Sequence, residues 1–374
     1  MPIPLEFTPE GTSAITLRQW SPAFWAPVTI FGAVDNFGRS KLIMQMAMTL
    51  VGLVALWALA NLDYRFLVDR FFWVFLIGSA ILLLITLIFG STGENRETAN
   101  TSWLTIPIIG IAIQPSEFVK IAFLCTFSKH LEGVGEDLNH PKKLLPLLAH
   151  AGLIIGLILL SGDLGVALVY LGVMALMLFS AGLSTWYFVG LLGTLGVSAP
   201  ILWKFLAPYQ RERIIYGFRP ELDPEGVGRQ ALMSRGCIAD GGFFGKGLFG
   251  GGHYEDLAAS HTDFIYATVC EKFGFLGGLL VVLAIVAMVL RLLWSAFRCR
   301  DAAGKFLCVG VAAVLIVQTL ENLWMCLALV PVVGITLPFV SCGGSSVLAC
   351  YLLLGVANSV SAREKKFSRR ARPL

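Results

Sequence analysis

The sequence contains few charged residues for its length. Only 14% of its 374 residues are Asp, Glu, Lys or Arg, whereas 56% are hydrophobic, and the mean hydropathy is +0.77. A soluble domain carries roughly 25% charged residues to cover its surface. This shortage excludes a soluble enzyme and a disordered protein and leaves a polytopic membrane protein. The net charge of +4 is too small to indicate nucleic-acid binding.

Several signatures of known chemistry are also missing. The chain has no Walker A phosphate loop, no Asp-x-Asp pair and no His-Glu-x-x-His zinc motif. Its eight cysteines form no Cys-x-x-Cys pair and lie mostly in apolar runs, so we expect buried thiols. Residues 245–250 fit G-x-G-x-x-G but follow no predicted strand, which excludes a dinucleotide site. No internal repeat is visible, and this argues against a transporter built from inverted repeats.

What the sequence does contain is a series of apolar runs, each about as long as a membrane-spanning helix. Two further runs are weaker, because 115–131 contains Glu117 and Lys120 and 345–360 is short. Residues 20–34 contain two prolines and are either a degenerate first span or an interfacial segment. We therefore predict an all-α, polytopic integral membrane protein with nine to ten transmembrane helices and a large extracytoplasmic loop. The clear runs are 42–60, 71–90, 144–160, 164–183, 185–203, 264–290 and 306–330.

Basic residues predict the orientation, since Lys and Arg gather on the cytoplasmic side. They cluster in alternate connections and in the C-terminal tail, which places the segments 91–114, 204–262 and 331–344 outside. Loop 204–262 has seven basic and seven acidic residues, and a loop of this length is usually functional. We expect three parts: an N-terminal segment, 1–41; a transmembrane domain, 42–362; and a basic cytoplasmic tail, 363–374.

The run His261-Thr262-Asp263 stands directly before the apolar stretch that begins at Phe264. One interpretation is structural, because Thr262 or Asp263 is a good helix N-cap. The other is catalytic, because a partly desolvated carboxylate at the membrane surface can act as a general base. The residues alone leave both open.

Polar residues within or beside the spans are a second group of candidates, because they are costly in a membrane. Glu117 and Lys120 are three residues apart and can pair on one helix face. Lys246 lies among eight glycines in 236–252, which form either an anion-binding backbone or a flexible or re-entrant loop. Residues 331–346 cannot form a continuous helix, so we expect an outward-facing cavity there.

Four blocks of the chain, within about residues 42–362, resemble the SEDS family of shape, elongation, division and sporulation proteins, and the RodA branch in particular. They are Gln114-Pro115-Ser116-Glu117 with Lys120 and the upstream Trp103; Tyr209–Arg213 with Asp223-Pro224; Gly241–Gly247 followed by His261–Phe264; and Asn322 with the segment Pro331–Ser346. The chain departs from the family where Cys342 replaces a tyrosine that usually precedes the final glycine pair.

The resemblance implies a peptidoglycan glycosyltransferase with ten spanning helices in the bacterial cytoplasmic (inner) membrane. Such an enzyme polymerises lipid II on the outer face, together with a class B penicillin-binding protein and other proteins of the elongation or division complex. Asp263 matches the family's essential aspartate and would be the catalytic base. A flippase for the same precursor and a non-catalytic scaffold for cell-wall synthases are the alternatives.

The remaining candidate residues have two roles. Cations are needed for the leaving pyrophosphate, and a divalent cation, Mg or Mn, is a further candidate for that role. The substrate-binding candidates are Arg211, Arg213, Lys246, His261, Thr262, Ser341, Gly343, Gly344 and Ser345. The structural or cavity candidates are Trp103, Gln114, Ser116, Glu117, Lys120, Asp163, Glu271 and Asn322.

Overall fold

The computed structural model describes residues 39–91, 101–106, 111–205 and 208–370. Within these residues, each of the nine predicted apolar runs from 42–60 onward falls on a helix of at least 17 residues. The candidate segment 20–34 lies outside the described residues. The long helices are α4 (Arg39–Asn61), α5 (Phe72–Phe89), α6 (Pro115–Val134), α7 (Pro141–Leu160), α8 (Leu164–Ser180), α9 (Thr185–Phe205), α13 (Ile265–Arg298), α14 (Ala302–Cys326) and α15 (Gly344–Arg370).

Six of the described helices are long and apolar enough to cross a membrane: α4, α5, α7, α13, α14 and α15. Large apolar side chains cover the outside of the bundle, including Trp57 on α4, Phe89 on α5 and Trp186 on α9. Apolar exposure on this scale is suited to lipid rather than to water. The membrane prediction is therefore supported, whereas the number of spans stays a prediction.

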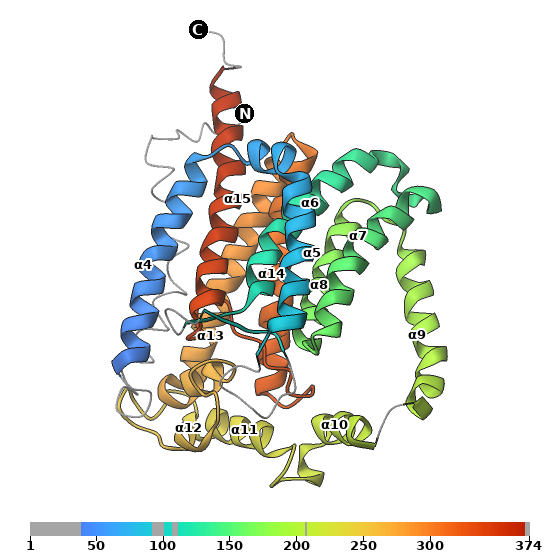
Figure 1. Cartoon of the computed structure of the whole chain (residues 1–374). Coiled ribbons are helices and arrows are strands. Elements are labelled where there is room, and N and C mark those ends of the chain that lie inside the picture. The colour runs from blue at the N-terminus through green and yellow to red at the C-terminus, as the bar shows by residue number, and fades with distance from the viewer. Residues whose placement is uncertain (1–38, 92–100, 107–110, 206–207, 371–374) are drawn as a thin grey trace, which may run out of the picture.

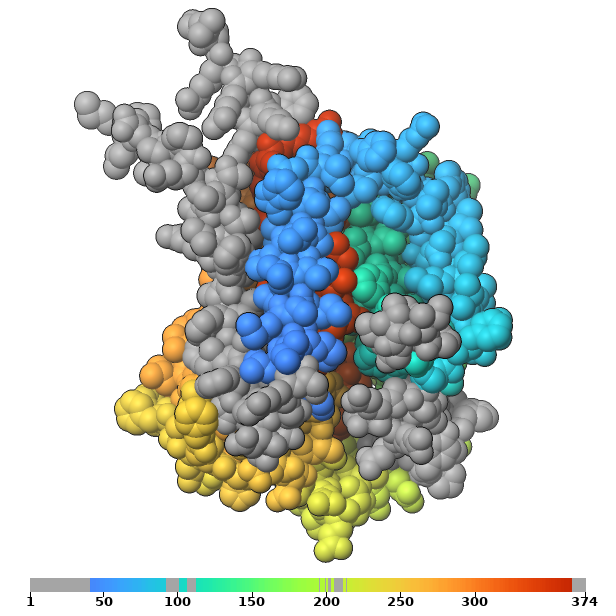
Figure 2. Space-filling model, turned by 60° about the vertical axis from the view of Figure 1, so that its left-hand side comes forward, coloured from blue at the N-terminus to red at the C-terminus, as the bar shows by residue number. Residues whose placement is uncertain are grey.

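The helices form a bundle around α14 (Figure 1). In its most apolar stretch, 72% of the residues of α14 are buried, against 17% for both α4 and α5. The buried helices carry polar residues such as Gln318 and Asn322, which the peripheral helices shield from lipid. Figure 2 shows α4 exposed on one face of the molecule, with parts of the predicted loop 204–262 below its first turn.

The predicted loop 204–262 is largely helical. It contains α10 (Pro208–Phe218), the 3₁₀ turn η3 (Pro220–Leu222), α11 (Arg229–Gly241) and the short α12 (His253–Asp256). These elements lie across one end of the bundle, at the bottom of Figure 1, which we call the loop end. The chain reaches Asp263 at this same end, immediately before α13.

The opposite end, which we call the tail end, carries the C-terminus (Figure 1). There Arg65 binds Glu132 of α6 at 2.6 Å and also pairs with Asp301, the N-cap of α14. These ion pairs join the start of the π-helical turn η1 (Phe66–Arg70) to the end of α6 and to the start of α14, and the 3₁₀ turn η2 (Gly135–Asn139) follows α6 at this end. Helix α15 continues through the predicted boundary at residue 362 to Arg370.

The fold is mostly helical, as predicted, and contains one small sheet besides the helices. Residues Leu104–Ile106 (β1) and Ile111–Ile113 (β2) form a two-stranded antiparallel sheet, with Leu104 opposite Ile113. Trp103 extends the pairing, since it exchanges backbone hydrogen bonds with Ser91. The sequence there alternates β-branched and other apolar residues, which favours strand pairing once both segments are held at the edge of the bundle.

Candidate functional site

The turn that carries Asp263 does not cap α13. Phe264 is the N-cap residue and no side chain makes a capping hydrogen bond. The hydroxyl of Thr262 donates instead to the carbonyl of Ala259 at 3.2 Å, and the amide of Phe264 donates to the same carbonyl. The capping interpretation of Thr262 and Asp263 is therefore wrong, and the half-buried carboxylate of Asp263 is left for another use.

The backbone of this turn is held by the predicted C-terminal block. The amide of Cys342 donates to the carbonyl of His261 at 2.8 Å, and the hydroxyl of Ser341 donates to the carbonyl of Thr262 at 2.6 Å. The side-chain amide of Asn322, on α14, donates to the carbonyl of Asp263 at 2.7 Å. Three successive carbonyls are thus fixed without use of the carboxylate.

The same block approaches the carboxylate itself. Asn322 also donates to the carbonyl of Ile335 at 2.6 Å and so ties the segment between α14 and α15 to the turn. Gly334 has φ +70°, and a Cβ built on it would lie 3.5 Å from Oδ2 of Asp263. The prediction that residues 331–346 cannot form a continuous helix is confirmed, since 331–343 are non-helical and α15 begins only at Gly344. This non-helical stretch forms one wall beside Asp263.

A second carboxylate, that of Asp163, belongs to the same region. Asp163 caps α8 by accepting a hydrogen bond from the amide of Val166, and its other oxygen accepts from the side chain of Gln114, both at 3.1 Å. The backbone N–H of Gln114 donates in turn to the hydroxyl of Ser345 at 3.3 Å. The first and last blocks of the resemblance are therefore in contact.

The surroundings of Asp263 favour its protonated form. Burial is the main cause that raises the pKa of Asp263 to about 6 from 3.8, and the negative charge of Asp163 adds to it, whereas a hydrogen bond from Thr262 acts in the opposite direction. A carboxyl group with a pKa of about 6 is ionised at neutral pH and is still a stronger base than an ordinary aspartate. Such a group is suited to accept a proton from a hydroxyl.

On α6, Glu117 and Lys120 form the predicted pair, with 2.7 Å between Oε1 and Nζ and with both side chains buried. The hydroxyl of Tyr170 donates to the carbonyl of Ser116 at 2.7 Å and fastens α8 to α6. A cavity of about 10 Å³ lies beside them, with Ser116 and Asp163 in its lining. It has room for about one water molecule and cannot hold a sugar ring.

The glycine-rich stretch around Lys246 is not an open anion cradle. The backbone N–H of Lys246 donates to the carbonyl of Glu271 at 2.9 Å, and the backbone N–H of Gly247 donates to the carbonyl of Lys272 at 3.0 Å. The loop therefore packs on the first turns of α13, and these N–H groups are already used. The Lys246 ammonium lies 3.0 Å from Asp240 Oδ1.

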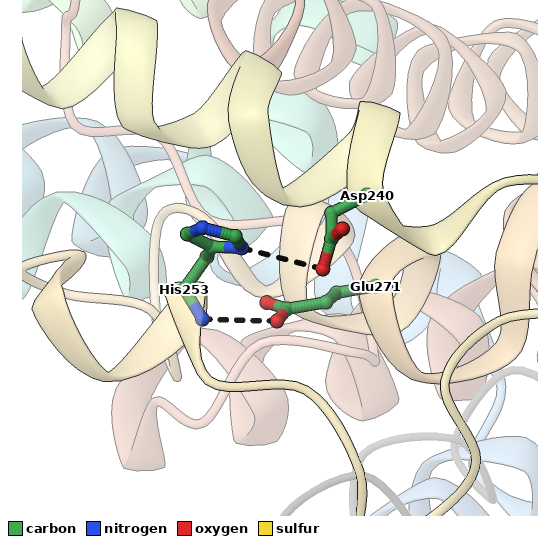
Figure 3. A group of neighbouring side chains, drawn as sticks. All are labelled: Asp240, His253 and Glu271. Carbon is green, nitrogen blue, oxygen red and sulfur yellow. Dashed lines mark hydrogen bonds and ion pairs between the residues drawn. The ribbon is translucent and has the colours of Figure 1, made fainter.

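Among the described residues, Asp240, His253 and Glu271 bring their ligand atoms within 4.8 Å of one another, which is close enough to consider a metal ion (Figure 3). Both oxygens of Glu271 already accept backbone N–H bonds, from Gly252 and His253 on one and from Tyr254 on the other, at 2.7–3.0 Å. Asp240 is held by Lys246 and His253. A cation would have to displace all of these partners, so the group does not fit a resident metal. Glu271 instead fixes α12 to α13.

The other predicted cations lie on α10. Arg211 donates to the carbonyl of Lys204 at 3.0 Å, whereas the side chain of Arg213 lies outside the described part of the structure. At the end of α10, Gly217 packs against Pro331. Lys41 was not among the predicted site residues, and its ammonium lies 2.6 Å from Nε2 of His261. The signal was a lysine at the boundary of the first apolar run, on the opposite side from the basic connections that predict the orientation.

Comparisons with known proteins identify the family of this chain. Residues 24–366 match the model of the FtsW/RodA/SpoVE family, described as "cell cycle protein". The chain is 32% identical to the "probable peptidoglycan glycosyltransferase FtsW" of Trichlorobacter lovleyi, over 88% of this chain and 86% of that one. It is 31% identical to the "peptidoglycan glycosyltransferase RodA" of Mycobacterium bovis, over 85% and 69%.

A solved structure has the same fold. It is described as showing "structural coordination of polymerization and crosslinking by a peptidoglycan synthase complex", and it superposes with a TM-score of 0.81 at 25% identity. The alignment covers 94% of this chain and 98% of that one. The chain therefore belongs to the FtsW/RodA/SpoVE family of cell cycle proteins.

Proposed function

We propose that this protein is a peptidoglycan glycosyltransferase that polymerises lipid II into glycan strands, with Asp263 as the general base. The observation that carries the proposal is the carboxylate of Asp263, whose pKa of about 6 suits a base and which lies in a turn whose three successive carbonyls, of His261, Thr262 and Asp263, each accept a hydrogen bond from the C-terminal block. The names of two relatives, "peptidoglycan glycosyltransferase", point to the same activity.

The reaction needs little from the protein beyond a base and an anion site. The 4-hydroxyl of the acceptor sugar attacks the anomeric carbon of the donor, and its proton passes to Asp263. The new C–O bond forms as the bond from the anomeric carbon to the pyrophosphate oxygen breaks, and the leaving group takes that electron pair. Because undecaprenyl pyrophosphate is already a stable anion, no strong general acid is required.

We further propose that the loop end faces the outside of the cytoplasmic membrane and that the C-terminus is cytoplasmic. The basic residues of the tail end support this orientation. A class B penicillin-binding protein would be the partner that crosslinks the strand, in line with the similar synthase complex, which coordinates polymerisation and crosslinking. The RodA branch, and with it a role in elongation, rests on Tyr209–Arg213 and Asp223-Pro224.

A divalent cation is a separate proposal. Since the oxygens of Asp240 and Glu271 have other partners, such an ion would enter with the pyrophosphate of the donor. Asp263 and Asp163, whose charges interact, are the carboxylates of the site that such an ion would face.

The deciding experiment is polymerisation of purified lipid II by the full-length protein with its partner. We expect glycan chains whose formation does not depend on the transpeptidase activity of the partner. A flippase would instead move labelled lipid II across proteoliposomes without making glycan. A scaffold would do neither, and either of these two results would refute the proposal.

A further inference from the structure

The first turn of α4 reaches the two segments that hold Asp263. Lys41 Nζ lies 2.6 Å from Nε2 of His261, which is two residues before Asp263. The thiol of Cys342 donates to the carbonyl of Lys41 at 3.8 Å. One turn later, Gln45 donates to the carbonyl of Ser341 at 3.4 Å. Lys41 is therefore fixed at the site by contacts on both sides.

The chemistry of the two side chains decides which of them carries the charge. An ammonium group has only donors, so Nε2 of His261 is the acceptor and the ring proton is on Nδ1. Burial, and then the charge of Lys41, lower the pKa of His261 to about 4, which agrees with a neutral ring. The positive charge thus belongs to Lys41, and His261 fixes the direction of the ammonium.

Lys41 differs in its partner from three of the other lysines. Lys120, Lys129 and Lys246 each lie within 3.0 Å of a carboxylate oxygen. No carboxylate of the described residues lies within 4.0 Å of Lys41 Nζ. A cation with a neutral partner keeps its full charge for a ligand, whereas a paired cation must first lose its carboxylate.

We propose that the Lys41 ammonium binds the diphosphate of the lipid-linked donor, with His261 as its positioning residue. The inference rests on the proposed function, because that reaction concentrates negative charge on the diphosphate as its bond to the sugar breaks. Lys41 keeps its proton throughout and stabilises the leaving group by charge and hydrogen bonding. The ammonium contacts His261, which belongs to the same turn as the base Asp263, so base and anion site share one turn of the chain.

The test compares Lys41→Gln with Lys41→Arg, and uses Lys142→Gln as the control. Lys142 is an exposed lysine at the start of α7, at the tail end of the bundle. Two quantities are measured on the full-length protein with its partner: kcat/KM for lipid II, and the Kd of undecaprenyl diphosphate. We expect Lys41→Gln to lower kcat/KM by about 10²–10³-fold, as for loss of one oxyanion donor, and to weaken diphosphate binding at least tenfold. Lys41→Arg should retain most of both, and Lys142→Gln all of both.

Unchanged diphosphate binding in Lys41→Gln would overturn the inference. Equal losses in Lys41→Arg and Lys41→Gln would also overturn it, because they would assign Lys41 a purely structural role. Should Lys41→Gln fold poorly, Lys41→Met keeps the apolar stem and takes its place. The binding measurement does not depend on polymerisation, so a wild-type protein that binds the diphosphate through Lys41 but makes no glycan would count against the proposed function alone.

Discussion

Replacement of Asp263 by asparagine should lower activity and raise stability at the same time. The side chain keeps its shape and loses the ability to accept a proton, and general-base catalysis is typically worth 10²–10⁴-fold in rate. The backbone carbonyl that Asn322 holds is unchanged by the substitution. We therefore expect a correctly folded protein whose rate of lipid II polymerisation has fallen by that factor.

The gain in stability follows from the pKa. The pKa of Asp263 is raised from 3.8 to about 6, so ionisation in the folded protein costs about 3 kcal/mol, at 1.36 kcal/mol for each unit. The cost is absent below pH 4, where both folded and unfolded states are protonated. It grows between pH 4 and 6 and is complete above pH 6. The variant should therefore unfold at a higher temperature than wild type at pH 8, and at the same temperature near pH 4.

The assay is glycan formation from lipid II together with a thermal unfolding curve in detergent at both pH values. Asp256→Asn is the matched control, because Asp256 is an exposed carboxylate in the same loop, and it should change neither quantity. Full polymerisation by Asp263→Asn would refute the general-base role. A variant that is both inactive and less stable at pH 8 would show that Asp263 supports the fold instead.

Three further predictions follow from the site. The kcat/KM of the wild-type protein should fall tenfold for each pH unit below about 6, because protonated Asp263 cannot act as a base; a pH profile that is flat down to pH 5 would contradict this. Asn322→Ala should cost about 2–4 kcal/mol of stability and most of the activity, because two buried carbonyls lose their donor. Gln318→Met is the control one turn earlier on α14. It removes a side-chain oxygen that has no hydrogen-bond partner among the described residues, and it should be tolerated. Ala239→Cys should react with an impermeant thiol reagent on intact cells if the loop end faces outside; Cys237, two residues earlier, is buried and should not react.

The sequence predicted the parts of this protein that depend on local pattern. Runs of apolar residues gave the long helices, because a period-free apolar stretch of about 20 residues has few alternatives in a membrane. The spacing of three residues between Glu117 and Lys120 predicted their ion pair, because helix geometry alone brings residues at this spacing together. Proline and glycine in 331–344 predicted the non-helical segment.

The contacts that form the site depend on residues far apart in the chain. Lys41 and His261 are separated by 220 residues, and no periodicity connects them. Lys246 and Asp240 are only six residues apart, but the glycine-rich stretch has no regular periodicity that would predict their pair, and the way the loop packs on α13 sets it. Cys237 is likewise covered by the packing of α11 on α13.

The way in which the turn is held explains why a departure from the family pattern is compatible with function. Cys342 stands where a tyrosine is usual, yet its contact with His261 is made by the backbone N–H and does not need a particular side chain. Ser341 and Asn322 hold the next two carbonyls through side chains that match the family. This framework holds backbone carbonyls and does not use the side chains of His261 and Asp263. A small residue at 342, such as serine or alanine, fits the buried position and keeps the N–H, so it should be tolerated, whereas proline, which lacks the N–H, should not.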